Sequence, residues 1–490
     1  MAKKILSFVL ATVLLMSCIP LTFSASAKGK GETVPLVVVS GFATVPLYLH
    51  ADTPEAEQVF APSSKRIAKH VSALLLPLMR FSVTNDWDRL ADEANPHLAA
   101  IFEQSLCDEN GNSVLDVGVR TFPESADHYM DFFTQDERDE HGFVHAAVDK
   151  LGEGNVFFFS YDWRLDPMDH ADALNKFIRN VKKQTGKDKI VLAACSMGGA
   201  ITLAYLSKYG ASDLKTLIMD NTAFQGISVV GRMFCQDYDT DTDTIIDYSF
   251  QFGSMAPWIK NTLTKYLKRS CLTERLGDFL IKMSAHNGKR IAEEVMYPVF
   301  GKMPGFWVFV PDKDYETAKS YVLDKEKNEE LIRKIDRYHY SVQKKAKKIL
   351  KKAMNEGCNL FILVNYGKYG IPVSTARMNC NDYLIDTSLS SGGAVCASNG
   401  QTLPKGYVQK VDCGHDHLSP DGRIDASTCM FPEITWFVRD MGHLDYPYGG
   451  DGADFLMWFV CANKQYNVRS DPRYPQFLKY DKLTKKLSPQ

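Results

Sequence analysis

The chain lacks the features that mark several broad classes of protein. Its 57 Lys and Arg and 59 Asp and Glu almost cancel, so no dominant basic field is present to attract nucleic acid. After residue 27, no apolar run is long enough and free enough of charge to cross a bilayer. No internal repeat and no low-complexity linker divides that part of the chain. With 45% hydrophobic residues, we expect a globular protein with a large core and no nucleic-acid partner.

Two groups of metal-ligating side chains also lack what a site requires. Alternate aspartates at 237–243 are spaced like a calcium loop, but the glycine at its sixth position and the terminal glutamate are missing, so a solvated acidic loop is expected. Cys413, His415 and His417 form a Cys-x-His-x-His pattern without a second ligand pair at zinc spacing. We interpret this pattern as a polar loop and predict no metal and no cofactor.

The first residues have the pattern of a targeting segment. Lysines at 3–4 precede an apolar stretch at 5–16, and small residues at 25–27 suit a signal peptidase. We therefore predict a signal peptide over 1–27 and an exported, secreted protein. Lipidation at Cys18 is an alternative, although the sequence before it fits a lipobox only loosely.

An oxidising destination makes disulfides an expectation for some of the eleven cysteines. The sequence leaves the connectivity open. Cys195, at the end of a buried strand, is expected to be a free packing residue. The candidate pairs are Cys235 with Cys271, Cys380 with Cys396, and Cys413 with Cys429.

Short, nearly unbroken apolar runs alternate with helical patterns along the chain. Such runs are typical of strands buried on both faces, and the alternation predicts an α/β fold with a mostly parallel sheet flanked by helices. The expected strands are 35–39, 156–161, 190–194, 216–219, 359–364, 406–411 and 434–438.

The segment 224–357 breaks this alternation. It holds the acidic stretch, loops rich in aromatic residues, and a charged helical run over 315–352. We interpret it as a cap or lid inserted between two parts of the α/β core, 28–223 and 358–490. Its basic run at 344–352 is expected to be the solvated face of a helix.

A serine stands between a strand-like run and a helix-like run. Ala194 comes two residues before Ser196 and Gly198 two residues after it, as a sharp strand-to-helix turn requires, because bulky neighbours would clash there. Such a turn presents the serine hydroxyl near a helix N-terminus. Turns of this kind also occur without a catalytic role, so the rest of the chain must supply a base, an acid and an oxyanion hole.

The C-terminal part offers a base and an acid in the order that this turn predicts, which is serine, acid, histidine. Asp421 lies in an Asp-Gly turn after the expected strand 406–411, and His443 follows the next expected strand. We predict Ser196 as nucleophile, Asp421 as acid and His443 as base. Asp425 is the alternative acid.

The oxyanion hole needs two backbone N–H groups aimed at the developing negative charge. The residue after the nucleophile, Met197, supplies the first. The second is expected from the loop after the first strand, where Gly41 allows a tight turn and Phe42 or Ala43 follows.

Four segments match one known family. Residues 35–47 are similar to its first strand and oxyanion loop, 161–165 (YDWRL) matches its YDWR signature, and 194–199 is similar to its nucleophile elbow. The pairs at 421–422 and 442–443 match its acid and base positions. On these segments the chain resembles the lecithin:cholesterol acyltransferase-like branch of the α/β-hydrolase superfamily. The C-terminal pairs also resemble secreted bacterial triacylglycerol lipases.

The resemblance implies an α/β-hydrolase fold with a cap and a lipid acyl ester as substrate. Trp163 and Arg164 would lie near the pocket rim or support it. We predict a secreted serine esterase or lipase that makes transient contact with a lipid surface through its cap. An O-acyltransferase, a peptidase or thioesterase with the same triad, and a non-catalytic binding protein on this scaffold are the alternatives.

Overall fold

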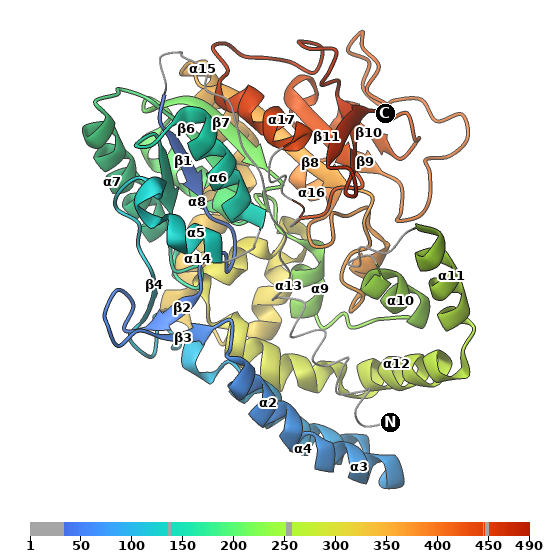
Figure 1. The fold of residues 1–490 in the computed structure, drawn as a ribbon. Helices are drawn as coiled ribbons and strands as arrows, with labels where there is room; N and C mark the ends of the chain where they lie inside the picture. Colours follow the sequence, from blue (N-terminus) through green and yellow to red (C-terminus); the bar gives the residue numbers. More distant parts are fainter. Residues whose placement is uncertain (1–33, 136–138, 251–256, 444, 446–449) are drawn as a thin grey trace.

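A computed structural model describes residues 34–135, 139–250, 257–443, 445 and 450–490, built around an eight-stranded sheet (Figure 1). The strand order is β13-β12-β11-β8-β7-β6-β1-β5, and neighbours from β12 to β5 run parallel while β13 is antiparallel to β12. This confirms the predicted α/β fold with a mostly parallel sheet. The strands are β1 (Leu36–Val39), β5 (Val156–Phe159), β6 (Ile190–Cys195), β7 (Leu214–Asp220), β8 (Asn359–Tyr366), β11 (Thr435–Arg439), β12 (Phe477–Asp481) and β13 (Lys486–Pro489).

The predicted strand at 406–411 is wrong. Val408 and Val411 are 77% and 47% exposed, so this segment has no buried face to add to a sheet. Its backbone N–H groups at Lys410 and Val411 donate to the side chains of Asp425 and Ser427 instead of to a neighbouring strand. The other expected strands are present, and the C-terminal pair β12 and β13 was not predicted.

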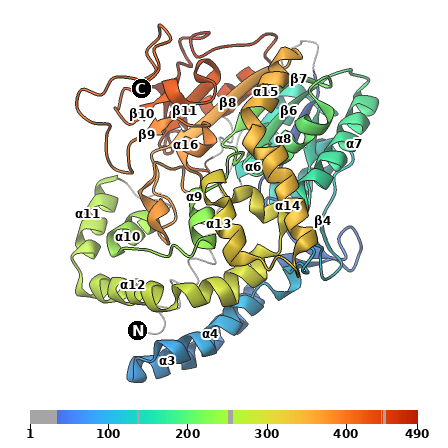
Figure 2. The ribbon, with the colours of Figure 1, turned by 180° about the vertical axis from the view of Figure 1, so that it is seen from behind.

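Helices cover both faces of the sheet (Figures 1 and 2). On one face α7 packs against α8, and α8 packs against β1, β6 and α15; on the other face α6 packs against β5, and α17 packs against α6 and β7. Local sequence sets the ends of α7, because Asp166 caps its N-terminus and Gly186 ends it in a left-handed conformation. These helices are α6 (Asp139–Leu151), α7 (Pro167–Thr185), α8 (Gly198–Tyr209), α15 (Ala346–Asn355) and α17 (Asp451–Val460).

An excursion between β1 and β5 forms a small antiparallel sheet and a group of helices. The sheet order is β3-β2-β4. α4 packs against α12 (Cys271–Ile291) and η3 (Ala292–Gly301), which belong to the segment 224–357 that we call the cap region. In both views α3 and α4 lie beneath α12 (Figures 1 and 2). The elements are β2 (Leu47–Leu49), β3 (Glu57–Phe60), α2 (Ser64–Ala73), α3 (Leu75–Thr84), α4 (Trp87–Ala100), η1 (Glu103–Ser105), β4 (Val117–Val119), η2 (Ala126–Tyr129) and α5 (Met130–Gln135).

The segment expected to be a cap is helical between β7 and β8. Its last helix, α15, packs against α8 and β8, so this helix covers the sheet, and its lysines at 347–348 and 351–352 are exposed as predicted. The preceding helices are α9 (Ser228–Phe234), α10 (Thr242–Phe250), α11 (Pro257–Lys268), α12 (Cys271–Ile291), η3 (Ala292–Gly301), η4 (Pro304–Phe309), α13 (Asp312–Val322), α14 (Glu329–Ser341) and η5 (Gln343–Lys345).

Short elements connect β8 to β11 through long loops. They carry much of the polar chemistry of the C-terminal part. They are η6 (Thr375–Met378), α16 (Thr387–Ser390), β9 (Val395–Cys396), β10 (Ile424–Asp425), η7 (Ala426–Thr428) and η8 (Pro432–Ile434).

No disulfide forms among the cysteines whose side chains are described. The predicted pairs Cys380–Cys396 and Cys413–Cys429 are therefore not formed, and Cys235 is not in a disulfide either. Cys195 is buried and is not in a disulfide, as expected. The predicted signal peptide, including Cys18, lies outside the described residues.

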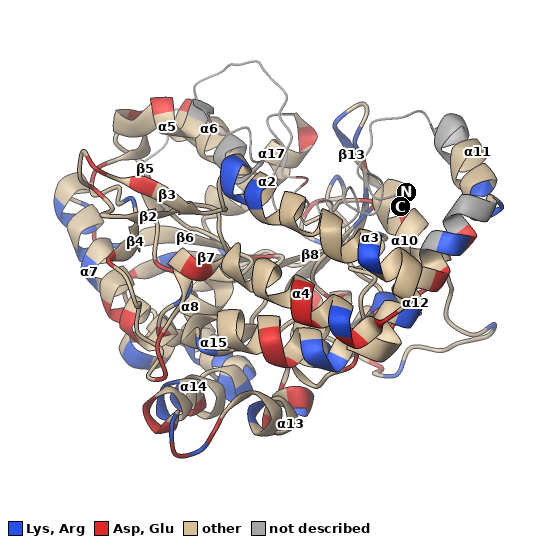
Figure 3. Cartoon of the chain, turned by 90° about the horizontal axis from the view of Figure 1, so that it is seen from below, with Lys and Arg blue, Asp and Glu red and all other residues tan. Residues whose placement is uncertain are grey.

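In the ribbon of Figure 3 the positions of Lys and Arg and those of Asp and Glu are interspersed rather than gathered by sign. Many are paired, for example Arg290 with Asp92 and Glu294 at the contact between α12 and α4. Across the described part of the chain, none of the helices combines the length and the apolar character that a membrane span requires.

Candidate active site

Ser196 occupies the sharp turn between β6 and α8. Its φ is +52°, in the left-handed region that non-glycine residues rarely adopt, and its carbonyl accepts a hydrogen bond from Ala223 N–H at 3.0 Å. A Cβ on Gly198 would lie 2.5 Å from the carbonyl oxygen of Val39, so only glycine fits there. The small residues around the serine therefore allow a strained turn that aims its hydroxyl away from the sheet.

His443 follows β11. In the sheet, β8 and β7 lie between β11 and β6, the strand that precedes Ser196. The Nε2 atom of His443 lies 3.0 Å from Ser196 Oγ, which is hydrogen-bond distance. Asp445 holds the turn around it, since its carboxylate accepts from Gly442 N–H at 3.0 Å and pairs with Lys482. The structure thus brings together the predicted serine and the predicted histidine.

Asp382 is the carboxylate that contacts this histidine. Its Oδ2 lies 2.8 Å from His443 Nδ1, and its main-chain carbonyl accepts from His443 N–H at 2.6 Å. Its Oδ1 accepts from the N–H groups of Leu384 and Ile385 at 3.1 and 2.7 Å. A carboxylate fixed by two backbone donors holds the imidazole in one orientation.

The loop that carries Asp382 is anchored on the cap region. Arg377, five residues earlier, pairs with Asp239 and Asp241 at 2.8 Å each. Tyr383 packs so closely on the glycine at 442 that a Cβ there would lie 1.9 Å from its ring. Acidic residues of the cap and the histidine loop therefore position the acid from both sides.

Asp421, the acid predicted from the sequence, is engaged away from His443 in the interactions that the described residues make. Its carboxylate accepts from Ser419 Oγ at 2.7 Å and from Tyr366 OH at 3.2 Å, and it lies 3.4 Å from Arg439 Nη1. The structure brings Asp382 to His443 in place of the predicted Asp421, because residues 406–411 form no strand that would deliver the Asp-Gly turn to the serine.

The alternative acid, Asp425, is also engaged elsewhere. It caps η7 by accepting from Ser427 N–H, and it accepts from Tyr407 OH at 2.9 Å. Sequence reasoning could have found Asp382 from the strand at 359–364, because the acid comes from the loop after this strand and the base from the loop after the next strand of the sheet. Its distance of sixteen residues from the end of β8 concealed it.

The predicted oxyanion loop is supported by the YDWR segment. Tyr161 OH donates to the carbonyl of Ser40 at 2.9 Å, and the Trp163 ring lies 4.3 Å from the Phe42 ring, measured between centroids. Met197 is the N-terminal cap of α8, where the first N–H groups of a helix have no intrahelical acceptor. Phe42 and Met197 thus come after the ends of two adjacent strands, β1 and β6.

Arg164 is completely buried and holds this support in place. Its guanidinium forms a two-point contact with Asp162, at 3.0 and 2.6 Å, and also donates to the carbonyls of Ser105 and Val117. Gly305 of the cap donates its N–H to the Arg164 carbonyl at 2.8 Å. The resemblance placed Arg164 at the rim or in a supporting role, and in the structure it is a support.

The three hydrogen-bonded residues of the site are buried. Ser196, His443 and Asp382 are 3%, 4% and 1% exposed. Burial also raises the pKa of the Tyr383 hydroxyl and of the nearby Asp386 carboxyl, which accepts from Ser228 N–H in α9. A buried and preorganised set of donors and acceptors is typical of a site where charge develops during reaction.

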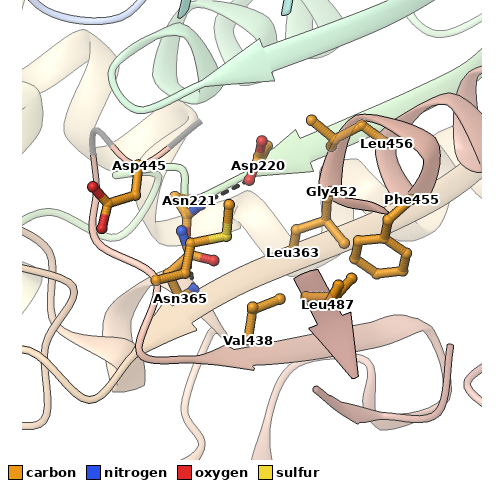
Figure 4. Close-up of a pocket in the computed structure, with 11 residues that line it drawn as sticks. Asp220, Asn221, Leu363, Asn365, Val438, Asp445, Gly452, Phe455, Leu456 and Leu487 are labelled. Atoms are coloured by element: carbon orange, nitrogen blue, oxygen red, sulfur yellow. Dashed lines mark hydrogen bonds between the residues drawn. The ribbon is translucent and has the colours of Figure 1, made fainter. Parts of the chain in front are cut away.

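A small, mostly apolar cavity lies at the ends of β7, β8 and β11 (Figure 4). Asn365 extends from β8 beside it and donates to the Gly442 carbonyl at 3.2 Å, while its N–H donates to Asn221 Oδ1 at 2.6 Å. The asparagines thus tie the histidine loop to the strand ends.

Among the described residues, one group of side chains could hold a metal ion. The donor atoms of Cys413, His415, His417 and Glu433 all lie within 4.8 Å of one another. We call this group the 413–433 cluster. None of its members contacts Ser196, His443 or Asp382 among the described interactions.

Comparison with known proteins identifies the fold. The model of the family described as "alpha/beta hydrolase fold" matches residues 123–443, which is more than half of the chain. No curated protein matches. Among solved structures, "The crystal structure of Tle4-Tli4 complex" contains a similar chain at 12% identity, covering 88% of this chain and 98% of that chain with a TM-score of 0.33.

Proposed function

The chain belongs to the α/β-hydrolase fold family, and from this premise we propose that it is a serine hydrolase of carboxylic acyl esters. The observation that carries the proposal is the continuous hydrogen-bonded path from Ser196 Oγ through His443 to Asp382. The strained serine turn and the backbone donors to the carboxylate support it, because both restrict the three side chains to one arrangement.

The geometry suggests a role for each group. Asp382 accepts a hydrogen bond from the N–H at His443 Nδ1, so Nε2 keeps its lone pair and removes the Ser196 proton as the oxygen attacks the ester carbonyl. The N–H groups of Met197 and Phe42 stabilise the oxyanion. His443 then donates its proton to the departing alcohol, and water attacks the acyl-enzyme by the same route in reverse.

Aromatic packing around the oxyanion loop supports an apolar acyl chain as the substrate group. The Phe42 ring lies 6.0 Å from that of Phe306 and 5.6 Å from that of Phe309, both in η4 of the cap region. Together with Trp163 they make one apolar cluster from the loop, the YDWR segment and the cap. The resemblance of these segments to the lecithin:cholesterol acyltransferase-like branch supports a lipid acyl ester.

The burial of the site favours acyl transfer as a second candidate. With Ser196 only 3% exposed, water reaches the acyl-enzyme less easily than it reaches an open site. An alcohol that enters with the lipid would then accept the acyl group. We place hydrolysis first because it needs no acceptor site.

Turnover of p-nitrophenyl esters with short and long acyl chains tests the proposal. We expect hydrolysis by the wild-type protein, labelling by a fluorophosphonate, and loss of both in Ser196→Ala. Ser207→Ala, which removes another hydroxyl from the same helix region, is the matched control and should behave as wild type. Absence of turnover and of labelling in the wild-type protein would refute the proposal. Ester product formed from an added alcohol would identify transfer.

We further propose that the protein is exported and contacts lipid surfaces, and exposed apolar residues on α3 support the second part of this proposal. Leu76, Met79 and Val83 on α3 are 54%, 60% and 86% exposed and are spaced to share one face of the helix. α3 packs on α4, which packs on α12 of the cap region. Co-sedimentation with phosphatidylcholine vesicles should decrease when the three residues become Ser, and should be unchanged in Leu483→Ser, an exposed apolar residue elsewhere.

A further inference from the structure

The 413–433 cluster joins two segments of the chain. Cys413, His415 and His417 belong to the long loop between β9 and β10, within the orange ribbon of Figure 1, and Glu433 belongs to η8 at the start of β11. The sequence pattern alone lacked further ligands. Folding supplies the fourth donor from sixteen residues beyond the last histidine.

The spacing of the donors matches a small tetrahedral ion. Glu433 Oε1 lies 3.2 Å from His415 Nδ1 and 3.3 Å from His417 Nε2. Nitrogen and oxygen donors placed about 2.0 Å from a tetrahedral zinc ion are separated by about 3.3 Å. All four donor atoms lie within 4.8 Å of one another, so a modest inward movement of the exposed Cys413 completes the tetrahedron.

His417 is the buried member of the 413–433 cluster, since only 1% of it is exposed. Its Nδ1 lies 2.7 Å from Gln476 Oε1. The amide nitrogen of Gln476 donates to the carbonyls of Pro432 and Thr435, which leaves its oxygen as an acceptor. His417 Nδ1 must therefore carry the proton, and Nε2 presents its lone pair to the cluster.

That lone pair has no hydrogen-bond partner. His417 Nε2 is buried and makes no hydrogen bond within the described structure, although the Glu433 carboxylate lies 3.3 Å away. An imidazole whose other nitrogen donates to a fixed oxygen is the usual arrangement of a metal-ligating histidine. A buried acceptor without a donor is costly, and a cation satisfies it together with the carboxylate.

We propose that Cys413, His415, His417 and Glu433 bind one zinc ion. A thiolate, two imidazoles and one carboxylate suit zinc better than the hard cations, which prefer oxygen donors alone. Four protein donors leave no open position for a substrate or water, so the site is structural. The ion fastens the 413–417 loop to the start of β11, the strand that ends just before His443. This inference does not rest on the proposed esterase activity.

Cobalt and zinc binding by the full chain tests the proposal. After treatment with a chelator and dialysis, the protein is titrated with Co²⁺ and then with Zn²⁺. We expect one Co²⁺ per chain, with the intense visible bands of tetrahedral cobalt and a thiolate charge-transfer band, and displacement by one Zn²⁺. The charge-transfer band disappears in Cys413→Ser, whose side chain is exposed, so that folding is preserved. Gln476→Ala weakens zinc binding by about 10- to 100-fold, since it removes the partner of His417.

Cys461→Ser is the matched control, because Cys461 is an exposed thiol outside the cluster. It should bind both metals as wild type does, and Zn²⁺ should raise the melting temperature of both proteins but not that of Cys413→Ser. Octahedral cobalt spectra, binding well below one ion per chain, or equal binding by Cys413→Ser would overturn the proposal. These measurements use no substrate, so their outcome is independent of ester hydrolysis.

Discussion

Replacing Asp382 by Asn tests which carboxylate orients His443. The side chain keeps its size and its place among the Leu384 and Ile385 N–H groups, so the fold should survive. An amide that donates toward Nδ1 forces the imidazole to carry its proton on Nε2, the atom 3.0 Å from Ser196 Oγ. In that tautomer the histidine cannot accept the serine proton.

The expected loss follows from this change of tautomer. A triad that keeps its geometry but has the wrong tautomer loses on the order of 10⁴ in kcat, which corresponds to about 5 kcal/mol of transition-state stabilisation. The assay is the initial rate of p-nitrophenyl ester hydrolysis at neutral pH, with circular dichroism to confirm that the variant is folded.

Asp421→Asn is the matched comparison. It removes a charge from the vicinity of Arg439 and a carboxylate bound by Ser419, but it touches no atom of the three hydrogen-bonded site residues. We expect kcat within about threefold of wild type, because a group without contact to the base does not set its tautomer. A loss in Asp421→Asn as large as that in Asp382→Asn, or near-normal rates in Asp382→Asn, would refute the reasoning.

Three further predictions follow from buried groups. Gly198→Ala places a Cβ 2.5 Å from the Val39 carbonyl, so we expect a loss of about 1–3 kcal/mol in stability and of fluorophosphonate labelling. Arg164→Met leaves the buried Asp162 carboxylate without its partner, and urea unfolding should show a loss of about 3–5 kcal/mol. Burial lowers the pKa of His339 below 6.5, so the unfolded chain binds this proton more readily and stability is lost as pH falls from 6.5 through the folded pKa. His339→Gln should therefore lose less stability than wild type between about pH 7 and pH 5.

Each of these has a control and a contrary result. Gly118→Ala, where the added Cβ meets only Ala51 at 3.5 Å, should leave labelling intact. Arg473→Met removes an exposed ion pair and should cost little stability. A loss equal to that of Arg164→Met would contradict the stabilising role of the buried Arg164–Asp162 pair. Equal acid sensitivity of His339→Gln and wild type would show that this histidine is not the group responsible.

The strands and the serine turn could be predicted because their signals are local. Buried parallel strands are apolar without interruption, as in the run from Ile190 to Cys195, and the small residues around Ser196 are required by one tight turn. His443 was predictable for a related reason, since it comes directly after a strand. Each of these inferences needs only a few consecutive residues.

The acid and the 413–433 cluster depend on contacts that no short window contains. Asp382 reaches His443 through a loop whose course is set by Arg377 and its partners in the cap region. The alternation of apolar and polar residues at 406–411 resembles a strand, and this predicted strand led to Asp421 as the acid. Glu433 joins three residues of a distant loop because Gln476 holds both segments. Sequence spacing does not report such side-chain contacts.

The separation of the three site residues along the chain has a consequence for folding. Ser196 and His443 are 247 residues apart, and Asp382 and His443 are 61 apart, so the site exists only after β11 has joined the sheet. Contacts between such distant residues form slowly, because the intervening chain must be ordered first. Recovery of fluorophosphonate labelling during refolding should therefore lag behind recovery of helical circular dichroism. The labelling then reports the last step of assembly, when β11 joins the sheet, rather than the first collapse of the chain.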